Sequence, residues 1–437
     1  MTRFKPSVAA AIVIANMVGT GVFTSLGFQL VEIQSAPVLL TLWAVGGLAA
    51  LCGALSYAEL GAALPRSGGE YNFLSEIYHP SAGFISGWVS ATVGFAAPTA
   101  LAAMTYGSYL SAVFPQLSAI WLATGLIVVL AFAHSRSHES SGSTQSLFTI
   151  LKIILIIGFA ALALIFNDTQ VDTSFTPAPG DGALLFSGAF AVSLIYVNYA
   201  YSGWNAATYI SGELENPQRS LPQVLIVSTS LVCASYLLLN YVFLAVAPME
   251  AMVGKVEVGY VAASYAFGEA GATIMGVLLA LLLVSTVSAM ILAGPRVLHR
   301  IGEDFPVFRP LGRVNGDGIP STAVLVQAAV ALAFLWTASF ERILVFSGAT
   351  MALNTFFTVM GVFFLRWKRP DLHRPFKTWL YPVTPIIFLL ITGWTLLYIV
   401  LQRPVEAAIC AGIVVSGGVF YAATRFMGTR LEGSVGP

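Results

Sequence analysis

Two glycine-containing stretches hold the groups of this chain that could bind a charged ligand without any reactive side chain. The first, IANMVGTGVF, places Gly19 and Gly21 on either side of Thr20, and the second, VNYAYSGWNAAT, contains Ser202–Gly203. Both lie near the middle of long apolar segments, where glycine destabilises a helix by roughly 0.5–1 kcal/mol relative to alanine. The sequence therefore predicts that both helices are interrupted and that each break leaves main-chain polar groups unpaired.

The chemistry available at such breaks comes from main-chain dipoles. The N–H groups of Thr20 and Gly21 would begin a half-helix, and the positive end of the helix dipole there suits a carboxylate. Carbonyls freed just before the breaks, near Met17, Tyr199 and Ala200, suit an ammonium group. An α-amino acid presents both charges on one carbon, so the two breaks together predict a site for one.

The alternative is that these glycines are small residues that allow close helix packing in a membrane. Non-helical backbone at this depth must face protein or a water-filled cavity, because lipid cannot pair its polar groups. Two breaks at corresponding positions of the chain favour the binding site over packing.

The elements that position these breaks are membrane-spanning helices. Of the 437 residues 57% are hydrophobic and 9% are charged, whereas a soluble domain carries about 25% charged residues. The net charge of zero argues against a nucleic-acid partner, and no alternating strand pattern indicates a barrel. Apolar stretches of about 17–25 residues mark spanning helices. They predict twelve, at roughly 7–30, 38–64, 84–113, 117–134, 145–166, 183–211, 222–247, 270–295, 320–337, 343–365, 381–401 and 405–424.

The two interruptions fall in the first and sixth of these helices. That spacing is expected when helices one to five and six to ten form two inverted halves, here about 7–166 and 183–366, with 381–424 as accessory helices. The whole chain, 1–437, then forms a single membrane domain. The segment 65–80 reads as a short interfacial helix at the cytoplasmic face.

The Lys/Arg bias orients the bundle with both termini in the cytoplasm, in the inner (plasma) membrane. The first helix lacks a small-residue cleavage site and is predicted to be retained. Three basic residues fall outside, Lys255, Arg342 and Arg403, and Lys152 lies within a helix. The other 16 of the 20 Lys and Arg fall inside, namely Arg3, Lys5, Arg66, Arg136, Arg219, Arg296, Arg300, Arg309, Arg313, Arg366, Lys368, Arg369, Arg374, Lys377, Arg425 and Arg430.

Several stretches along nearly the whole chain form a specific combination. They are GTGVF at 19–23, SYAELGAALPRSGGEYNFL at 56–74, FTILK at 148–152, YAYSGWNAATYISGELENPQRSLP at 199–222 and GPRVLHRIGEDFP at 294–306. In this combination the sequence resembles the amino acid–polyamine–organocation superfamily, particularly its L-type amino acid transporter branch.

The resemblance implies a leucine-transporter-type five-plus-five inverted repeat with broken helices one and six, working by alternating access. It implies that the amides of Thr20 and Gly21 receive the substrate carboxylate and that Tyr199 closes over the substrate as a gate. Trp204 and Asn205 match the end of the same motif as accessory residues. The carbonyls implied to receive the ammonium are those of Met17, Tyr199, Ala200 and Ser202.

Animal relatives bond to a single-pass glycoprotein through a cysteine in the loop after helix three. Here that loop reads FPQLSAI, so no disulfide-linked heavy chain is expected.

Lys152 is the one basic residue within a predicted span. It either snorkels to the cytoplasmic interface or holds its ammonium in a cation site between helices one, five and eight, with Thr286 as hydroxyl partner. In sodium-independent relatives a lysine at the matching position takes the place of a bound sodium, so the resemblance predicts sodium-independent transport.

Four other charged residues near the cytoplasmic face are predicted mainly to stabilise the fold. Glu59 is either a proton site or a partner of a nearby base such as Arg66 or of backbone N–H groups. Glu213, Glu215 and Arg219 are predicted to form an ion-pair network.

The absence of acidic residues and arginine at mid-depth in helices one, three, six, eight and ten predicts a neutral substrate side chain. A cationic amino acid or polyamine carrier is the alternative, and a non-transporting receptor of the same fold is a remote one. An enzyme would need a nucleophile with a base, or metal ligands, within the spans. Neither a metal nor a cofactor is expected, because the cysteines stand unpaired in predicted helices and the histidines in cytoplasmic loops: Cys52, Cys233 and Cys410; His79, His134, His138, His299 and His373.

Overall fold

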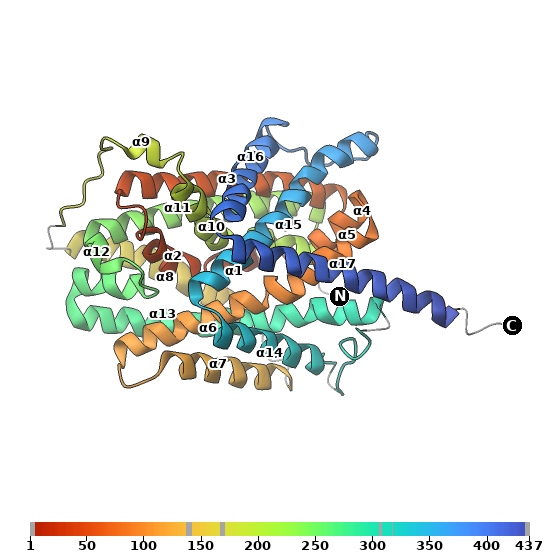
Figure 1. The fold of residues 1–437 in the computed structure, drawn as a ribbon, viewed down its shortest axis with the longest axis horizontal. Helices are drawn as coiled ribbons and strands as arrows, with labels where there is room; N and C mark the ends of the chain where they lie inside the picture. The colour runs from red at the N-terminus through yellow and green to blue at the C-terminus, as the bar shows by residue number, and fades with distance from the viewer. Residues whose placement is uncertain (1–4, 137–141, 167–170, 306–307, 317, 433–437) are drawn as a thin grey trace.

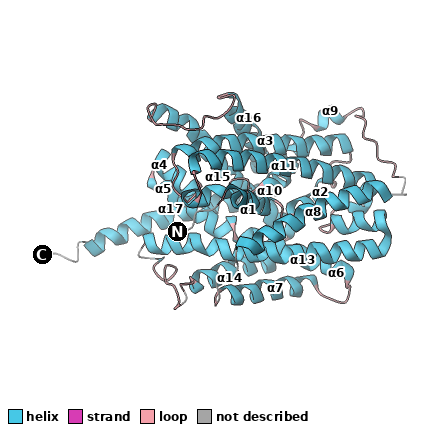
Figure 2. Ribbon diagram, turned by 180° about the vertical axis from the view of Figure 1, so that it is seen from behind, coloured by secondary structure: helices cyan, strands magenta, loops and turns pink. Residues whose placement is uncertain are grey.

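The structure, a computed structural model, describes residues 5–136, 142–166, 171–305, 308–316 and 318–432 (Figure 1). Within these ranges the chain is helical and contains no strand, as Figure 2 shows. Arg3 and His138 lie outside the described residues. In chain order the elements are α1 Pro6–Met17, α2 Gly21–Gln29, α3 Ala36–Ala63, α4 Glu70–Ile77, α5 Pro80–Val89, the π-helix η1 Ser90–Gly94, α6 Ala96–Val113, α7 Ala119–His134, α8 Gly142–Phe166, α9 Asp181–Leu184, α10 Gly188–Tyr201, the 3₁₀-helix η2 Ala206–Glu213, α11 Pro217–Val246, α12 Met249–Met252, α13 Val258–Asp304, α14 Ser321–Thr337, α15 Phe340–Lys368, α16 Val383–Gln402 and α17 Pro404–Glu432.

Nine helices of the described chain are long and apolar enough to cross a membrane. Two shorter apolar helices, α7 and α14, coincide with predicted spans. The remaining predicted span, 183–211, is divided between α10 and η2. The helical membrane bundle is therefore present, while the count of twelve spans stays a prediction.

Several helices begin where the local sequence provides a cap. Ser35, Ser187 and Ser339 each accept a hydrogen bond from the N–H three residues later, at the starts of α3, α10 and α15. Such caps satisfy one of the N–H groups that a helix start leaves unpaired.

The first predicted helix is interrupted after Met17. Val18 leaves the helical region with a ψ of 79°, and α2 begins at Gly21. The Gly19 N–H donates to the Met17 carbonyl at 2.8 Å, a tight turn that an α-helix does not contain. The interruption expected from the sequence is therefore observed.

The sixth predicted helix is interrupted after Tyr201. Ser202 is extended, with φ −57° and ψ 150°, and Gly203 has a φ of +97°, a conformation that favours glycine. The chain resumes as the 3₁₀-helix η2 rather than as an α-helix. This break is also where the sequence predicts it.

The broken helices lie in the middle of the bundle. Figure 1 shows α1, α2 and α10 between the long helices α3 and α11 on one side and α13 on the other. Helix α1 packs on α11 and α8, and α10 packs on α2 and α3. Met17, Val18 and Ala200, which flank the breaks, are at most 2% exposed.

Some boundaries differ from the sequence prediction. The predicted span 270–295 continues as α13 to Asp304, so His299 lies in a helix, and His134 is the last residue of α7. The prediction that these two histidines lie in loops is therefore wrong. The interfacial helix expected within 65–80 is α4.

Candidate substrate site

The start of α2 presents main-chain donors without partners. Within the described chain, the N–H groups of Thr20 and Gly21 donate to no acceptor, and the first bond of this turn runs from the Phe23 N–H to the Thr20 carbonyl at 3.0 Å. Both residues are buried. Unpaired N–H groups at a buried helix start are suited to an anionic ligand group.

Carbonyl groups of the two broken helices converge on one hydroxyl. The Tyr236 Oη, from α11, lies 2.6 Å from the Met17 carbonyl oxygen and 3.2 Å from that of Ala200. One hydroxyl proton can serve only one of these acceptors at a time. The Met17 oxygen also accepts the Gly19 N–H at 2.8 Å, so the Ala200 oxygen is the acceptor with capacity left for an ammonium group while the hydroxyl donates to Met17.

A third of the four predicted carbonyls, that of Tyr199, is used locally. The Tyr199 carbonyl accepts from the Ser202 N–H at 3.0 Å and from the Ser202 hydroxyl at 2.6 Å. These bonds close the end of α10 and hold Ser202 beside the break.

The two broken helices touch where glycine removes the side chain. A Cβ on Gly21 would lie 2.4 Å from the Ala200 Cα, and a Cβ on Gly203 would lie 2.9 Å from backbone atoms of Asn16. Gly21 and Ala200 thus bring the start of α2 against the end of α10. The close packing that the sequence offered as an alternative is thus present at both glycines, and the binding site stays a prediction.

The Tyr199 side chain is 7% exposed and makes a hydrogen bond with the side chain of Thr20. The structure therefore brings the predicted gate residue onto the predicted carboxylate-binding turn. Such a contact would have to rearrange for a ligand to reach the N–H groups below it.

Lys152 reaches Thr286 across the bundle. The Lys152 Nζ donates to the Thr286 Oγ1 at 2.8 Å, and the lysine is 4% exposed. The burial excludes snorkelling in this conformation. A small cavity, with room for at most about one water molecule, adjoins the pair and is bounded by Val18, Gly19 and apolar residues of α13. The ammonium thus lies between the first break, α8 and α13, where the sequence placed it.

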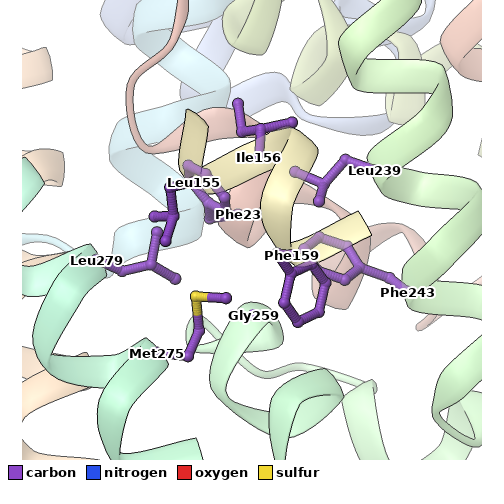
Figure 3. Close-up of a pocket in the computed structure, with 9 residues that line it drawn as sticks. All are labelled: Phe23, Leu155, Ile156, Phe159, Leu239, Phe243, Gly259, Met275 and Leu279. Atoms are coloured by element: carbon purple, nitrogen blue, oxygen red, sulfur yellow. The ribbon is translucent and has the colours of Figure 1, made fainter. Parts of the chain in front are cut away.

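A second, apolar space, too small to admit a water molecule, lies between α2, α8, α11 and α13 (Figure 3). It shares Phe23 and Leu279 with the cavity beside Lys152. Its lining presents no charged or hydrogen-bonding side chain, so it offers no partner for the charges of an amino acid. The residues are Phe23, Leu155, Ile156, Phe159, Leu239, Phe243, Gly259, Met275 and Leu279.

Trp204 and Asn205 point to other partners. Trp204 packs edge-on against Tyr57 with ring centroids 4.6 Å apart, and the Asn205 amide donates to the Glu70 carboxylate. These two residues fasten the chain after the break rather than joining the carbonyl cluster.

The predicted pairing of Glu59 with a base is confirmed, but the base suggested by the sequence is wrong. Glu59 pairs with Arg366, at 2.8 and 2.6 Å, and accepts the Thr378 N–H at 2.7 Å, so its base is not Arg66. The prediction of a backbone N–H partner is confirmed.

In the part of the chain that is described, no ion pair joins Glu213, Glu215 and Arg219. The Glu215 backbone carbonyl instead accepts from the Ser220 hydroxyl at 2.6 Å. A helix start organised by backbone bonds replaces the expected network.

Sequence reasoning missed two residues, Tyr236 and Glu70. Tyr236 stands in the apolar run ASYLLLN, where a hydroxyl must find a buried acceptor, and this was the available signal. Glu70 begins α4 in a segment assigned to the interface, yet it is 1% exposed. Nothing in its local sequence indicates that burial.

Two broken helices that meet in the middle of a multi-pass bundle are the arrangement of secondary transporters. A family model, Amino acid permease, matches residues 4–420, and the chain belongs to this family. It is an amino acid transporter and not an enzyme.

Curated relatives agree over nearly the whole chain. The chain is 26% identical to human b(0,+)-type amino acid transporter 1 over 94% of its length and 85% of the relative. It is 28% identical to mouse Large neutral amino acids transporter small subunit 2, over 94% of its own length and 79% of the relative. It is 27% identical to mouse Asc-type amino acid transporter 1, over 94% of its own length and 80% of the relative.

Proposed function

We propose that this protein carries out sodium-independent transport or exchange of neutral L-amino acids by alternating access. The proposed architecture has twelve spanning helices, with two inverted halves of five and accessory helices α16 and α17. Both termini lie in the cytoplasm of a cell whose inner (plasma) membrane holds the protein.

The observation that carries the proposal is the juxtaposition of unpaired donors and under-used acceptors at the two breaks. The N–H groups of Thr20 and Gly21 would receive the carboxylate. The carbonyls of Met17 and Ala200, now sharing the Tyr236 hydroxyl, would receive the ammonium. Carbonyls of Tyr199 and Ser202 complete the proposed set, and Tyr199 would open and close over the substrate.

Sodium independence is supported by the buried ammonium of Lys152. It lies beside Val18 and Gly19 and donates to Thr286, so a fixed positive charge already occupies the space between the first break and α13. A sodium ion at the same place would be repelled by it.

A neutral side chain is supported by the walls around the first break. Phe23, Leu279, Leu282 and Leu283 line the cavity next to Gly19, and Lys152 supplies its only ionisable side chain. A cationic side chain would find like charge there and no carboxylate. The names of the relatives, which include a large neutral amino acids transporter, point the same way.

The protein is proposed to work without a disulfide-linked partner. The loop that follows α6, residues 114–118, and the start of α7 contain no cysteine, and the three cysteines of the chain are buried in helices.

The test is uptake by proteoliposomes that contain the purified chain, against a panel of twenty labelled amino acids, with and without internal substrate and a pH gradient. Saturable uptake of neutral amino acids that internal substrate accelerates is the expected result. Competition by arginine or a polyamine as strong as by leucine or alanine would replace the proposal with the cationic carrier. Binding without flux would identify a receptor.

A further inference from the structure

Glu70 is a buried carboxylate that is satisfied by neutral donors. It begins α4 and is 1% exposed. Its Oε1 accepts from the Tyr57 hydroxyl at 3.0 Å and from the Asn205 amide, and its Oε2 accepts from the Tyr209 hydroxyl. Within the described chain it forms no ion pair. Two of its three donors, Asn205 and Tyr209, come from the segment that follows the second break.

The turn that precedes Glu70 holds the same segment at two more points. The Ser67 Oγ accepts the Gly212 N–H at 2.9 Å. Gly69 has a φ of +54°, and a Cβ there would lie 2.7 Å from the Tyr209 ring. Residues 67–70 therefore contact η2 at Tyr209 and Gly212, with a backbone that requires glycine where the ring of Tyr209 packs.

The contacts continue from Glu70 into the surrounding bundle. The Tyr57 hydroxyl of α3 also lies near the Thr358 side chain of α15, and that of Tyr209 lies near Ser90, the first residue of the π-helix η1. A 3₁₀ segment and a π turn thus meet at Tyr209. Both kinds of irregular helix are frequent at functional hinges.

We propose that the 67–70 turn is a clasp for η2 and that Glu70 is its positioning residue for the substrate carbonyls. After the break, Trp204 packs against Tyr57, and Asn205 and Tyr209 donate to Glu70, so these three residues hold the chain that follows Gly203. Their position sets the direction in which the carbonyls of Ala200 and Ser202 face the site. This inference rests on the proposed function, because it assigns those carbonyls to the substrate ammonium.

The test uses purified full-length variants in proteoliposomes. Glu70→Gln keeps the shape and removes the charge that orders three donors. Asn205→Asp places a second carboxylate against Glu70. In the double variant Glu70→Gln/Asn205→Asp the two groups exchange roles, so that an amide at position 70 donates to a carboxylate at position 205. Glu76→Gln, on the same helix α4 but 3.5 Å from Arg369 at the surface, is the matched control.

We expect Glu70→Gln to raise KM by about tenfold, since a hydrogen bond to a charged group contributes on that scale, with a smaller change in maximal rate. Asn205→Asp should raise KM more, and the double variant should recover a lower KM than Asn205→Asp alone. Glu76→Gln should match the unmodified protein. Absence of saturable uptake in the unmodified protein would reject the proposed function itself, before any variant is compared.

Thermal unfolding separates positioning from folding. Cys52, Cys233 and Cys410 are buried, so a thiol-reactive dye reports unfolding without added labels. Glu59→Gln removes an equally buried carboxylate that does not touch η2, and should lower the unfolding midpoint while KM stays within about twofold. If Glu70→Gln behaves like Glu59→Gln, with a lower midpoint and an unchanged KM, or if the double variant is no better than Asn205→Asp, the positioning role is rejected.

Discussion

Gly21 and Lys152 are the residues at which a single side chain decides most about the proposed site. At Gly21 the absence of a side chain lets two backbones touch, and at Lys152 a charge is held inside the bundle by one hydroxyl. Each gives a prediction that depends on one contact.

Gly21→Ala should abolish or strongly weaken transport. The added Cβ would meet the Ala200 backbone at 2.4 Å, so α2 and α10 must separate. Overpacking of this kind costs about 1–3 kcal/mol. Uptake at a fixed substrate concentration and the unfolding midpoint measure the effect. Gly158→Ala on α8, where a Cβ meets nothing within 4 Å, is the control and should behave as the unmodified protein. Normal uptake by Gly21→Ala would show that the two helices need not touch.

Lys152→Met should reduce the maximal transport rate without destabilising the fold. Replacing a buried charge by an apolar group of similar size is often neutral or stabilising, and the Thr286 hydroxyl still donates to the Leu282 carbonyl at 3.4 Å. The unfolding midpoint should therefore stay or rise while uptake falls. A variant that transports normally would reduce Lys152 to a packing residue.

At the scale of elements, helix α10 is bonded to α15 and, through it, to the corner between α16 and α17. Tyr196 of α10 donates to Glu341 of α15 at 2.7 Å, and Arg403, between α16 and α17, donates to the same oxygen at 2.8 Å. Burial lowers the pKa of Arg403, but Tyr196 and Glu341 raise it by more, so its net pKa lies above the ordinary value. The broken helix is thus linked through Glu341 to the corner between α16 and α17.

Arg403→Gln should lower the free energy of unfolding by about 1 kcal/mol, because the pair is about one third exposed and solvent screens part of the attraction. Arg342→Gln is the comparison, since Arg342 lies 3.7 Å from Glu406 and is 52% exposed. That change should be within a few tenths of a kcal/mol. The thermal unfolding midpoints of the two variants, measured side by side, test this difference. Equal effects would mean that the bond between α10 and Glu341 adds nothing to stability.

At the scale of the whole molecule, the prediction is independence from sodium and from a partner chain. The purified protein alone should transport, and replacing sodium by choline in the external buffer should leave the initial rate unchanged. Lys152 already supplies the positive charge at the proposed cation site. Strict dependence on sodium, with the chain shown to be folded, would contradict this assignment.

The sequence by itself determined the helical membrane bundle, the family and both helix breaks. The length of an apolar stretch and its lack of charged residues are properties of that stretch alone. The interruptions at Gly19–Gly21 and Ser202–Gly203 are likewise local effects of the backbone. It also predicted the contact between Lys152 and Thr286, which the family resemblance placed together. The two breaks are local and do not depend on how distant segments meet, whereas the contact between Lys152 and Thr286 joins two distant helices.

Only the tertiary structure decided which side chains meet across the bundle. Tyr236 between two carbonyls, Glu59 on Arg366, and Glu70 beneath η2 each join residues that are far apart in sequence. The sequence around a glutamate does not show whether its carboxylate faces water or three buried donors, because distant segments of the chain supply those donors. For the same reason the interfacial assignment of 65–80 located α4 but could not reveal that its first residue is buried against the broken helix.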